Sequence, residues 1–471
     1  MILAANATTP SHPERFHTIE RRTPSHLWRV AWGGQPRFAS HPGARGNIHS
    51  TLMNRPHTPH SRSPSAGTSN RGPLDGVVVL DLTRVMSGPY CSMMLGDMGA
   101  RVIKIEHPMY GDDTRHWGPP FQEGESAYFL SVNRNKESVA LDFSVREGRA
   151  LLDRLLAQAD VVMENFRPGV MARLGLDYGS LSAAYPRLVY CSISGFGQSG
   201  PRSQEPGYDA VAQAEGGLMS ITGLPDGPPI RPGLPIADLA SGMFAASGIL
   251  AALFNRERTG RGQAVDVALL DSVAALLTYQ AAGYFATGVA PQRLGNRHAT
   301  IAPYDLFNAS DGEFILAVGN DAQFQRCCEA IGLDALARDA RFATNRDRVA
   351  RYDELRDVLA APFRTAPRAT WLERLRAAGV PAGPVHDVRE FFADRYVRDR
   401  GLVTTMDHAA AGPLDMVRSP ISMSGTPTSV KTPPPLLGQH TAAVLKEILG
   451  LDDEEVRQLE AQRVIACARH L

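Results

Sequence analysis

The sequence lacks the features that would set it apart from ordinary globular proteins. Its 49 Lys and Arg residues balance 49 Asp and Glu residues, so no net charge draws it toward nucleic acid or anionic membranes. Its five cysteines include no Cys-x-x-Cys pair, which predicts free thiols in a reducing compartment, here the cytoplasm. The two most apolar windows, 236–254 and 265–287, contain aspartates and predict buried elements, not membrane spans.

Two common phosphate-binding patterns are also missing. The turn after the first expected strand is Ser87-Gly88-Pro89, with one glycine in place of the Gly-x-Gly-x-x-Gly of dinucleotide-binding folds. The chain contains no Gly-x-x-x-x-Gly-Lys-Ser/Thr loop either. A dinucleotide cofactor or a P-loop nucleotide is therefore not expected.

Residues 1–72 have few acidic side chains and no periodic apolar pattern. They hold half of the 14 His residues, many Arg, Ser and Pro residues, and only Glu14 and Glu20 as acids. This composition predicts a disordered tail, or an upstream start codon with translation beginning near Met53. An organelle transit peptide is the alternative, although the Pro and Gly density would interrupt an amphipathic helix.

The folded part begins near Pro73 as an alternation of short apolar strands and helices. A strand, a helix and a strand within about thirty residues form a βαβ unit, and the pattern then continues. This alternation predicts a doubly wound α/β sheet. The expected strands are 76–82, 101–106, 138–142, 160–166, 188–194 and 264–269, and the expected helices are 87–99, 146–159, 238–256 and 271–287.

A second unit is expected because 471 residues exceed one ordinary core. From about residue 303 a hairpin pattern ending at Val318 and three helical patterns, at 321–331, 352–363 and 369–378, predict a smaller α+β domain. The stretch 408–438 is rich in Pro and Gly and should be a linker. Two amphipathic helices, at 442–449 and 453–462, follow it.

Asp238 is the most informative single residue. It lies in Leu234-Pro-Ile-Ala-Asp-Leu-Ala-Ser-Gly242, where a turn-rich segment meets a long Ala-rich helical pattern. Small residues after a carboxylate allow a ligand to approach the backbone closely. The simpler alternative is a plain helix N-cap aspartate.

Several segments, in order over about 73–460, resemble the family III (CaiB/BaiF-type) CoA-transferases. That group includes formyl-CoA transferase, carnitine CoA-transferase and the α-methylacyl-CoA racemases. Two of the segments are Gly111-Asp-Asp-Thr-Arg115 and Glu164-Asn-Phe-Arg-Pro-Gly169. The others are 73–82, 99–106, 133–136, 195–197, 207–209, 238–243, 259–263, 379–384 and 435–441.

The resemblance implies a fold and a quaternary arrangement. A large Rossmann-like domain (73–290) would bind CoA, and a smaller α+β domain would cover 300–407. The segment 408–471 would return to the large domain, and two chains would thread through one another as an interlocked-ring homodimer. The substrates would be an acyl-CoA and a carboxylic acid, with no tightly bound cofactor, no metal, no nucleic acid and no membrane.

The resemblance makes Asp238 the nucleophile. Its carboxylate would attack the thioester to give a mixed anhydride, which the released CoA thiolate would convert to an aspartyl-CoA thioester. With an ordinary aspartate pKa of ~3.9 it should already be ionised at neutral pH. The pocket should exclude water, because both intermediates hydrolyse.

The residues that the resemblance places against CoA are Ser87, His107, Asn165, Phe166, Arg167, Arg173, Tyr208 and Asp209. Simpler roles remain open for four of them: solvated surface arginines for Arg167 and Arg173, a turn residue for Asp209, and a surface histidine for His107. Met86 and His107 stand where formyl-CoA transferases have Gln and Arg, which disfavours formyl or oxalate substrates. Met86 could also be a core residue.

Racemization and simple CoA binding are the alternatives to CoA transfer. Racemases of the family carry a His at the position of Tyr208, and a phenol is a poor base at neutral pH, which favours transfer. A non-catalytic CoA-binding paralogue would not need Asp238. The sequences of segments 298–304 and 433–440 are most similar to those of family members that use succinyl-CoA and dicarboxylates such as glutarate. Arg231 and Arg297 are candidates to hold the distal carboxylate.

Overall fold

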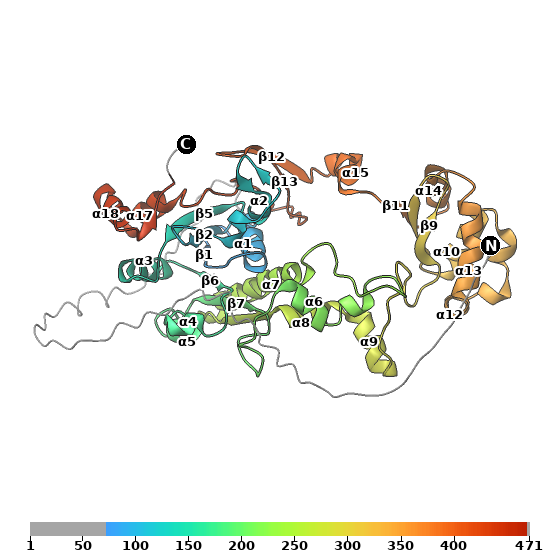
Figure 1. Cartoon of the computed structure of the whole chain (residues 1–471), viewed down its shortest axis with the longest axis horizontal. Helices are drawn as coiled ribbons and strands as arrows, with labels where there is room; N and C mark the ends of the chain where they lie inside the picture. The colour runs from blue at the N-terminus through green and yellow to red at the C-terminus, as the bar shows by residue number, and fades with distance from the viewer. Residues whose placement is uncertain (1–71, 469–471) are drawn as a thin grey trace, which may run out of the picture. The chain divides into compact units, whose positions relative to one another are not determined.

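The computed structural model describes residues 72–468. The tail expected over 1–72 therefore lies outside the described residues, apart from Gly72. Figure 1 shows the order of the elements along the chain. Two cores on either side of one sheet, and a third core built from residues 302–380, hold most of the buried apolar side chains.

A seven-stranded sheet in the order β14-β5-β2-β1-β6-β7-β8 organises the large domain. All neighbouring strands are parallel except β14, which pairs antiparallel with β5. The strands are β1 (Val78–Asp81), β2 (Arg101–Glu106), β5 (Lys136–Leu141), β6 (Val161–Glu164), β7 (Val189–Ser194), β8 (Ala264–Ala268) and β14 (Ile465–Ala466). Strands β2 and β5 lie on one side of β1, and β6, β7 and β8 lie on the other. The strand order therefore reverses between β1 and β6, and open α/β sheets bind ligands at such a switch point.

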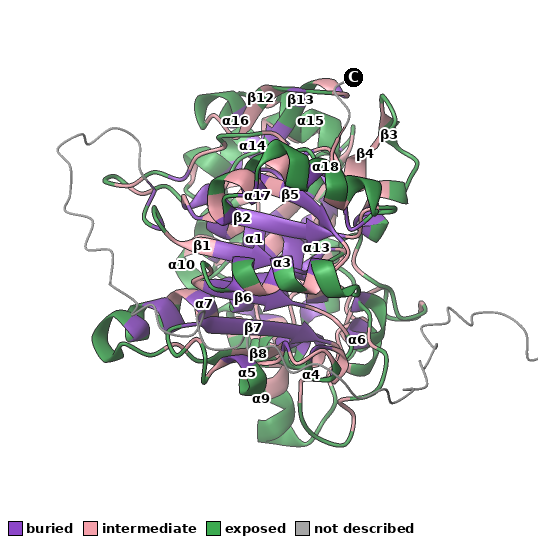
Figure 2. Cartoon of the chain, turned by 90° about the vertical axis from the view of Figure 1, so that its left-hand side faces the viewer, coloured by how far each residue is buried: buried purple, intermediate pink, exposed green. Residues whose placement is uncertain are grey.

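Helices cover both faces of this sheet, as expected of a doubly wound fold. Figure 2 shows β2, β6 and β7 mostly in the buried colour, whereas the edge strand β8 is largely exposed or half-buried. One core contains side chains of α1 (Ser87–Asp97), α6 (Asp209–Glu215), α7 (Ile236–Thr259) and α8 (Leu269–Leu276). The opposite core contains side chains of α3 (Arg146–Leu156), α17 (Thr441–Leu449) and α18 (Asp453–Ala461). The C-terminal segment thus packs on the sheet through β14 and α17.

Helix α7 is the longest element, with 24 residues. Among the described residues it alone is long and apolar enough to cross a membrane, judged by length and composition, and 50% of its apolar stretch is buried inside the protein. Ala237, Ala245 and Ile249 of α7 are fully buried in the core that contains α1 and α8. Its small side chains allow it to pack closely on α1.

The helix expected over 271–287 is in fact two helices, which corrects the prediction. α8 ends at Leu276, and α9 runs over Thr278–Thr287. Thr278 has a positive φ of 40°, which breaks the regular hydrogen-bond series between the two. A threonine carries no sequence signal for such a backbone, because β-branched residues rarely adopt it.

The second domain has its own three-stranded sheet, in the order β11-β10-β9. Its strands are β9 (Tyr304–Asn308), β10 (Glu313–Ala317) and β11 (Ala382–Pro384), and its main helices are α10 (Asp321–Ala330), α13 (Tyr352–Phe363) and α14 (Arg368–Ala377). A further hairpin joins β12 (Val403–His408) to β13 (Gly412–Val417). The boundary expected between 407 and 408 falls inside this hairpin, and β13 lies within the stretch expected to be a linker.

Candidate active site

A cavity of about 180 Å³ lies at the switch point of the sheet. Loops that follow β1, β6 and β7 line it, together with the first turns of α1 and α7. Six of the nine residues predicted for the site line this cavity: Ser87, Asn165, Phe166, Arg167, Tyr208 and Asp238. Most of the residues named from the sequence therefore lie at the crevice expected from the topology, whereas His107, Arg173 and Asp209 do not line it.

A second cavity of about 450 Å³ adjoins the first and shares Arg167 and Pro168 with it. Its lining includes the acids Glu164, Asp177 and Asp266. It does not contain Asp238, so we assign the chemistry to the smaller cavity. In the part of the chain that the structure describes, no group of three or more His, Cys, Asp or Glu side chains could hold a metal ion.

Asp238 lies in the first turn of α7, but it is not the helix cap. The N-cap position is Pro235, which offers no capping side chain. The carboxylate of Asp209, the first residue of α6, instead accepts hydrogen bonds from the backbone N–H groups of Ala237 at 2.9 Å and Asp238 at 3.4 Å. Because another residue satisfies the helix end, the side chain of Asp238 is free to face the cavity.

The charge state of Asp238 differs from the expectation. Burial, together with the nearby negative charge of Asp209, raises the pKa of the Asp238 carboxyl to about 7, although a hydrogen bond with the Ser87 side chain acts in the opposite direction. At neutral pH the free protein therefore holds roughly half of this group protonated. The sequence expectation of full ionisation assumed an ordinary aspartate in water, which this group is not.

Asn165 and Phe166 form the β6 side of the cavity. The side-chain amide of Asn165 accepts from the backbone N–H of Arg84 at 2.9 Å and donates to the carbonyl of Arg84 at 2.7 Å. The guanidinium of Arg84 lies 5.3 Å from the centre of the Phe166 ring. Asn165 thus ties the loop after β1 to the loop after β6.

The other predicted CoA contacts are placed less uniformly. Tyr208 is 70% exposed, and Arg167 is exposed at the cavity edge. Arg173 is exposed at the end of α4 (Val170–Arg173) and does not line the cavity. His107 is half-buried outside the cavity lining, stacked on Tyr110 with ring centres 3.9 Å apart.

The remaining candidates lie near the site or away from it. Met86 is buried in a small apolar cluster with Met93 and Val132. The guanidinium of Arg231 is exposed, 3.8 Å from the Asp209 carboxylate. Arg297 lies 3.7 Å from the centre of the Tyr352 ring in the second domain.

Sequence reasoning missed Tyr128, on α2 (Ala127–Val132). Burial, together with the charges of Asp238, Asp209 and Asp112, raises the pKa of its phenol to about 12. The phenol therefore keeps its proton at neutral pH and interacts electrostatically with Asp238. The segment around Tyr128 has no motif that signals this position.

Comparison with known proteins identifies this arrangement. The family model of CoA-transferase family III matches residues 74–441. The chain is 43% identical over 402 residues to a succinyl-CoA:glutarate CoA-transferase of Mus musculus, covering 85% of this chain and 92% of that protein. It is 45% identical over 386 residues to a succinate–glutarate CoA-transferase of Agrobacterium fabrum, covering 81% and 96%.

The structural comparison agrees. A CAIB/BAIF family protein from Brucella suis, solved by crystallography, matches with a TM-score of 0.72 at 44% identity, covering 81% of this chain and 100% of that one. The region that the family model matches contains every residue that lines the cavity, Asp238 included. The chain therefore belongs to CoA-transferase family III and is an enzyme that transfers CoA from an acyl-CoA to a carboxylic acid.

Proposed function

We propose that the enzyme transfers CoA from succinyl-CoA to a dicarboxylic acid such as glutarate, with Asp238 as the covalent nucleophile. The names of its relatives support the two substrates. The observation that carries the mechanism is a half-buried aspartate facing a cavity at the ligand-binding crevice of the sheet. A confined site of this kind limits the access of water to hydrolysable intermediates.

The proposed reaction has two mirrored halves. A carboxylate oxygen of Asp238 attacks the thioester carbonyl, the C–S bond breaks, and CoA leaves as the thiolate from a mixed anhydride. The thiolate then attacks the Asp238 carbonyl carbon, which releases succinate and leaves an aspartyl-CoA thioester. The acceptor carboxylate reverses both steps and leaves with CoA. We propose that Ser87, Asn165, Phe166, Arg167 and Tyr208 contact the CoA substrate, because they line the cavity.

A panel of acids tests the assignment. Succinyl-CoA is mixed with glutarate, oxalate, formate and monocarboxylic acids, and the new CoA thioesters are measured by mass spectrometry. The proposal expects glutaryl-CoA as the main product, and an adduct on Asp238 that hydroxylamine cleaves. Exchange with oxalate or formate alone would refute the dicarboxylate assignment, and α-deuteration of a 2-methylacyl-CoA without an acid would identify a racemase.

Arg231 is the side chain that we expect to bind the distal carboxylate of the acceptor. Its exposed guanidinium lies 3.8 Å from Asp209, which in turn contacts the first turn of α7. Arg231→Gln should raise KM for glutarate by roughly 10- to 100-fold, the value of one charge-assisted pair, and leave KM for pentanoate unchanged. The control is Arg258→Gln, which removes an arginine from the last turn of α7. Equal effects on both acids would contradict this role.

The pKa of Asp238 predicts the pH dependence of the reaction. Because the ionised carboxylate is the nucleophile and its pKa is raised to about 7, kcat/KM should rise with pH below 7 and level off above it. Asp209→Asn removes the neighbouring charge and keeps an acceptor oxygen for Ala237, so it should move the midpoint to lower pH. A midpoint near 4 in the unmodified enzyme would contradict the assignment.

The proposal includes an interlocked homodimer in the cytoplasm. Large apolar side chains at Phe254 and Phe285 are 69% and 80% exposed, which is typical of a surface that a partner covers. All five cysteines are free, which fits a reducing compartment. Light scattering should give twice the chain mass of 51.0 kDa. A monomer active at the same dilution would contradict the dimer.

A further inference from the structure

The loop between β1 and α1 contains a strained residue. Val85 has a φ of 72°, a left-handed backbone that a β-branched side chain rarely adopts. Such a conformation is energetically unfavourable and persists only where the surroundings enforce it. The loop leads directly into Ser87, the first residue of α1, which lines the same cavity as Asp238 and lowers the pKa of its carboxyl through a side-chain hydrogen bond.

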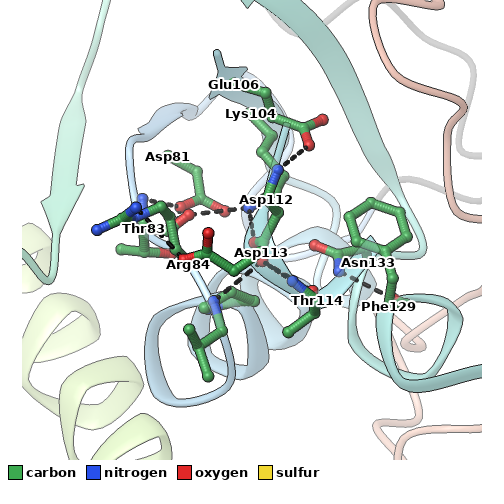
Figure 3. Close-up of polar contacts among 12 residues, drawn as sticks. Asp81, Thr83, Arg84, Lys104, Glu106, Asp112, Asp113, Thr114, Phe129 and Asn133 are labelled. Atoms are coloured by element: carbon green, nitrogen blue, oxygen red, sulfur yellow. Dashed lines mark hydrogen bonds and ion pairs between the residues drawn. The ribbon is translucent and has the colours of Figure 1, made fainter. Parts of the chain in front are cut away.

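Three side chains from outside the loop hold its backbone. Lys104 donates to the carbonyl of Thr83 at 2.8 Å, and Asp112 accepts from the N–H of Val85 at 3.2 Å. Asn165 holds Arg84 between them through two hydrogen bonds. Figure 3 shows Lys104 and Asp112 meeting beside the loop, with Thr83 and Arg84 on it. Each of the three residues before Met86 therefore has a backbone group held by a distant side chain.

Lys104 and Asp112 also bind one another, at 2.9 Å, with both side chains fully buried. Thr114 adds hydrogen bonds to Asp112 from its N–H and its hydroxyl. Burial alone would raise the pKa of Asp112, but Lys104 and Thr114 lower it to about 2, so the carboxylate stays ionised. A buried ion pair is weak evidence for stability, since an apolar pair of similar volume is often as good or better. Because this ion pair contacts the backbone of a strained loop, its position indicates a role other than stability.

We propose that Asp112 and Lys104 are positioning residues for CoA transfer: they hold Val85 in its left-handed conformation and so keep Ser87 against the carboxyl of Asp238. This inference rests on the proposed role of Asp238. It assigns to the Gly111-Asp-Asp-Thr-Arg115 segment a task in the reaction, although Asp112 does not line the cavity. The two residues touch no substrate; they act through Ser87.

Asp112→Asn tests the proposal because it removes the charge that binds Lys104. Displacement of Ser87 should lower kcat by roughly 10- to 100-fold, since small misplacements have effects of this size. It should also shift the acid limb of kcat/KM to higher pH, because Asp238 loses a stabilising hydrogen bond. Asp209 on α6 and Tyr128 on α2 also interact electrostatically with Asp238, and the variant changes neither residue.

Two further variants separate positioning from stability. Val85→Gly removes the penalty for the left-handed backbone, so Val85→Gly/Asp112→Asn should recover kcat and the acid limb relative to Asp112→Asn alone. Ser87→Ala should shift the acid limb in the same direction, and adding Asp112→Asn to it should shift the limb no further. No recovery with glycine, or independent addition of the two shifts, would overturn the proposal.

The matched control is a second buried ion pair that does not contact the loop. Arg134 binds Asp97 at 2.6 Å, with side-chain exposures of 6% and 2%. Asp97→Asn should lower Tm without changing the pH at which kcat/KM rises. If Asp112→Asn also lowers Tm without changing this pH, Asp112 has only a structural role. If Asp112→Asn does not fold, Lys104→Met/Asp112→Leu removes both charges and is judged by the same acid limb. Full activity of Asp238→Asn would refute the nucleophile instead, whatever the loop variants do.

Discussion

Asp238→Asn should lower kcat for CoA transfer by at least about ten-thousandfold, the scale seen when a covalent nucleophile is removed. The amide fills the same volume in the first turn of α7, but its oxygen cannot form the mixed anhydride. The neighbouring carboxylate of Asp209 does not replace it, because its oxygens accept hydrogen bonds from the N–H groups of α7 and from Gln213. The measurement is steady-state exchange between succinyl-CoA and glutarate, with intact-protein mass spectrometry to detect the adduct.

The stability of the same variant provides its control. The folded pKa of Asp238 is raised above the unfolded value, so ionisation of this group costs the folded state free energy at high pH and nothing below about pH 4. Asparagine removes this cost, which is no more than about 4 kcal/mol above pH 7. Asp238→Asn should therefore have a higher Tm than the unmodified protein at pH 8 and an equal Tm at pH 4. An inactive variant that is also destabilised at pH 8 would leave misfolding as the cause.

The sheet, and the place of Asp238 in the cavity, could be predicted from the sequence because both depend on local patterns. Short β-branched runs predicted β1, β2, β6 and β7 to within a few residues. Asp238 stood out because turn chemistry meets a helix of small residues there. The six cavity-lining residues followed from motifs whose order along the chain matches a known family.

The remaining features depend on contacts between residues far apart in the sequence. Asp209 caps α7 from 28 residues away, which released Asp238 from the capping role that its position alone suggested. Tyr128 on α2 interacts electrostatically with Asp238, and no pattern around it marks this. The raised pKa of Asp238 follows from burial beside a second carboxylate, and the side chains that hold the backbone around Val85 come from β2, from the segment before η1 (Asp113–His116) and from the loop after β6. Spacing along one chain carries none of this information.

The close approach of α1 and α7 gives the second large effect. A Cβ atom added at Gly242 would lie 2.7 Å from the carbonyl oxygen of Ser87 and 3.1 Å from the ring of Tyr90. The contact with the Tyr90 ring is tight, and the contact with the Ser87 carbonyl is shorter than packing allows and is with backbone, so the first turn of α1 must move away from α7. Gly242→Ala should therefore separate Ser87 from Asp238 and lower kcat by roughly a hundredfold, with a stability loss of about 1–3 kcal/mol from overpacking.

A second helical glycine separates this steric effect from the general consequences of adding a methyl group. Gly283 in α9 has open space where its Cβ would lie, so Gly283→Ala should leave kcat unchanged and stabilise the helix by up to about 1 kcal/mol. Because α7 carries Asp238, the proposed nucleophile, and α1 carries Ser87, the close packing at Gly242 sets the distance between these two side chains. Gly242→Ala with normal kcat and only a lower Tm would show that this distance does not matter, and that Ser87 has no part in the reaction.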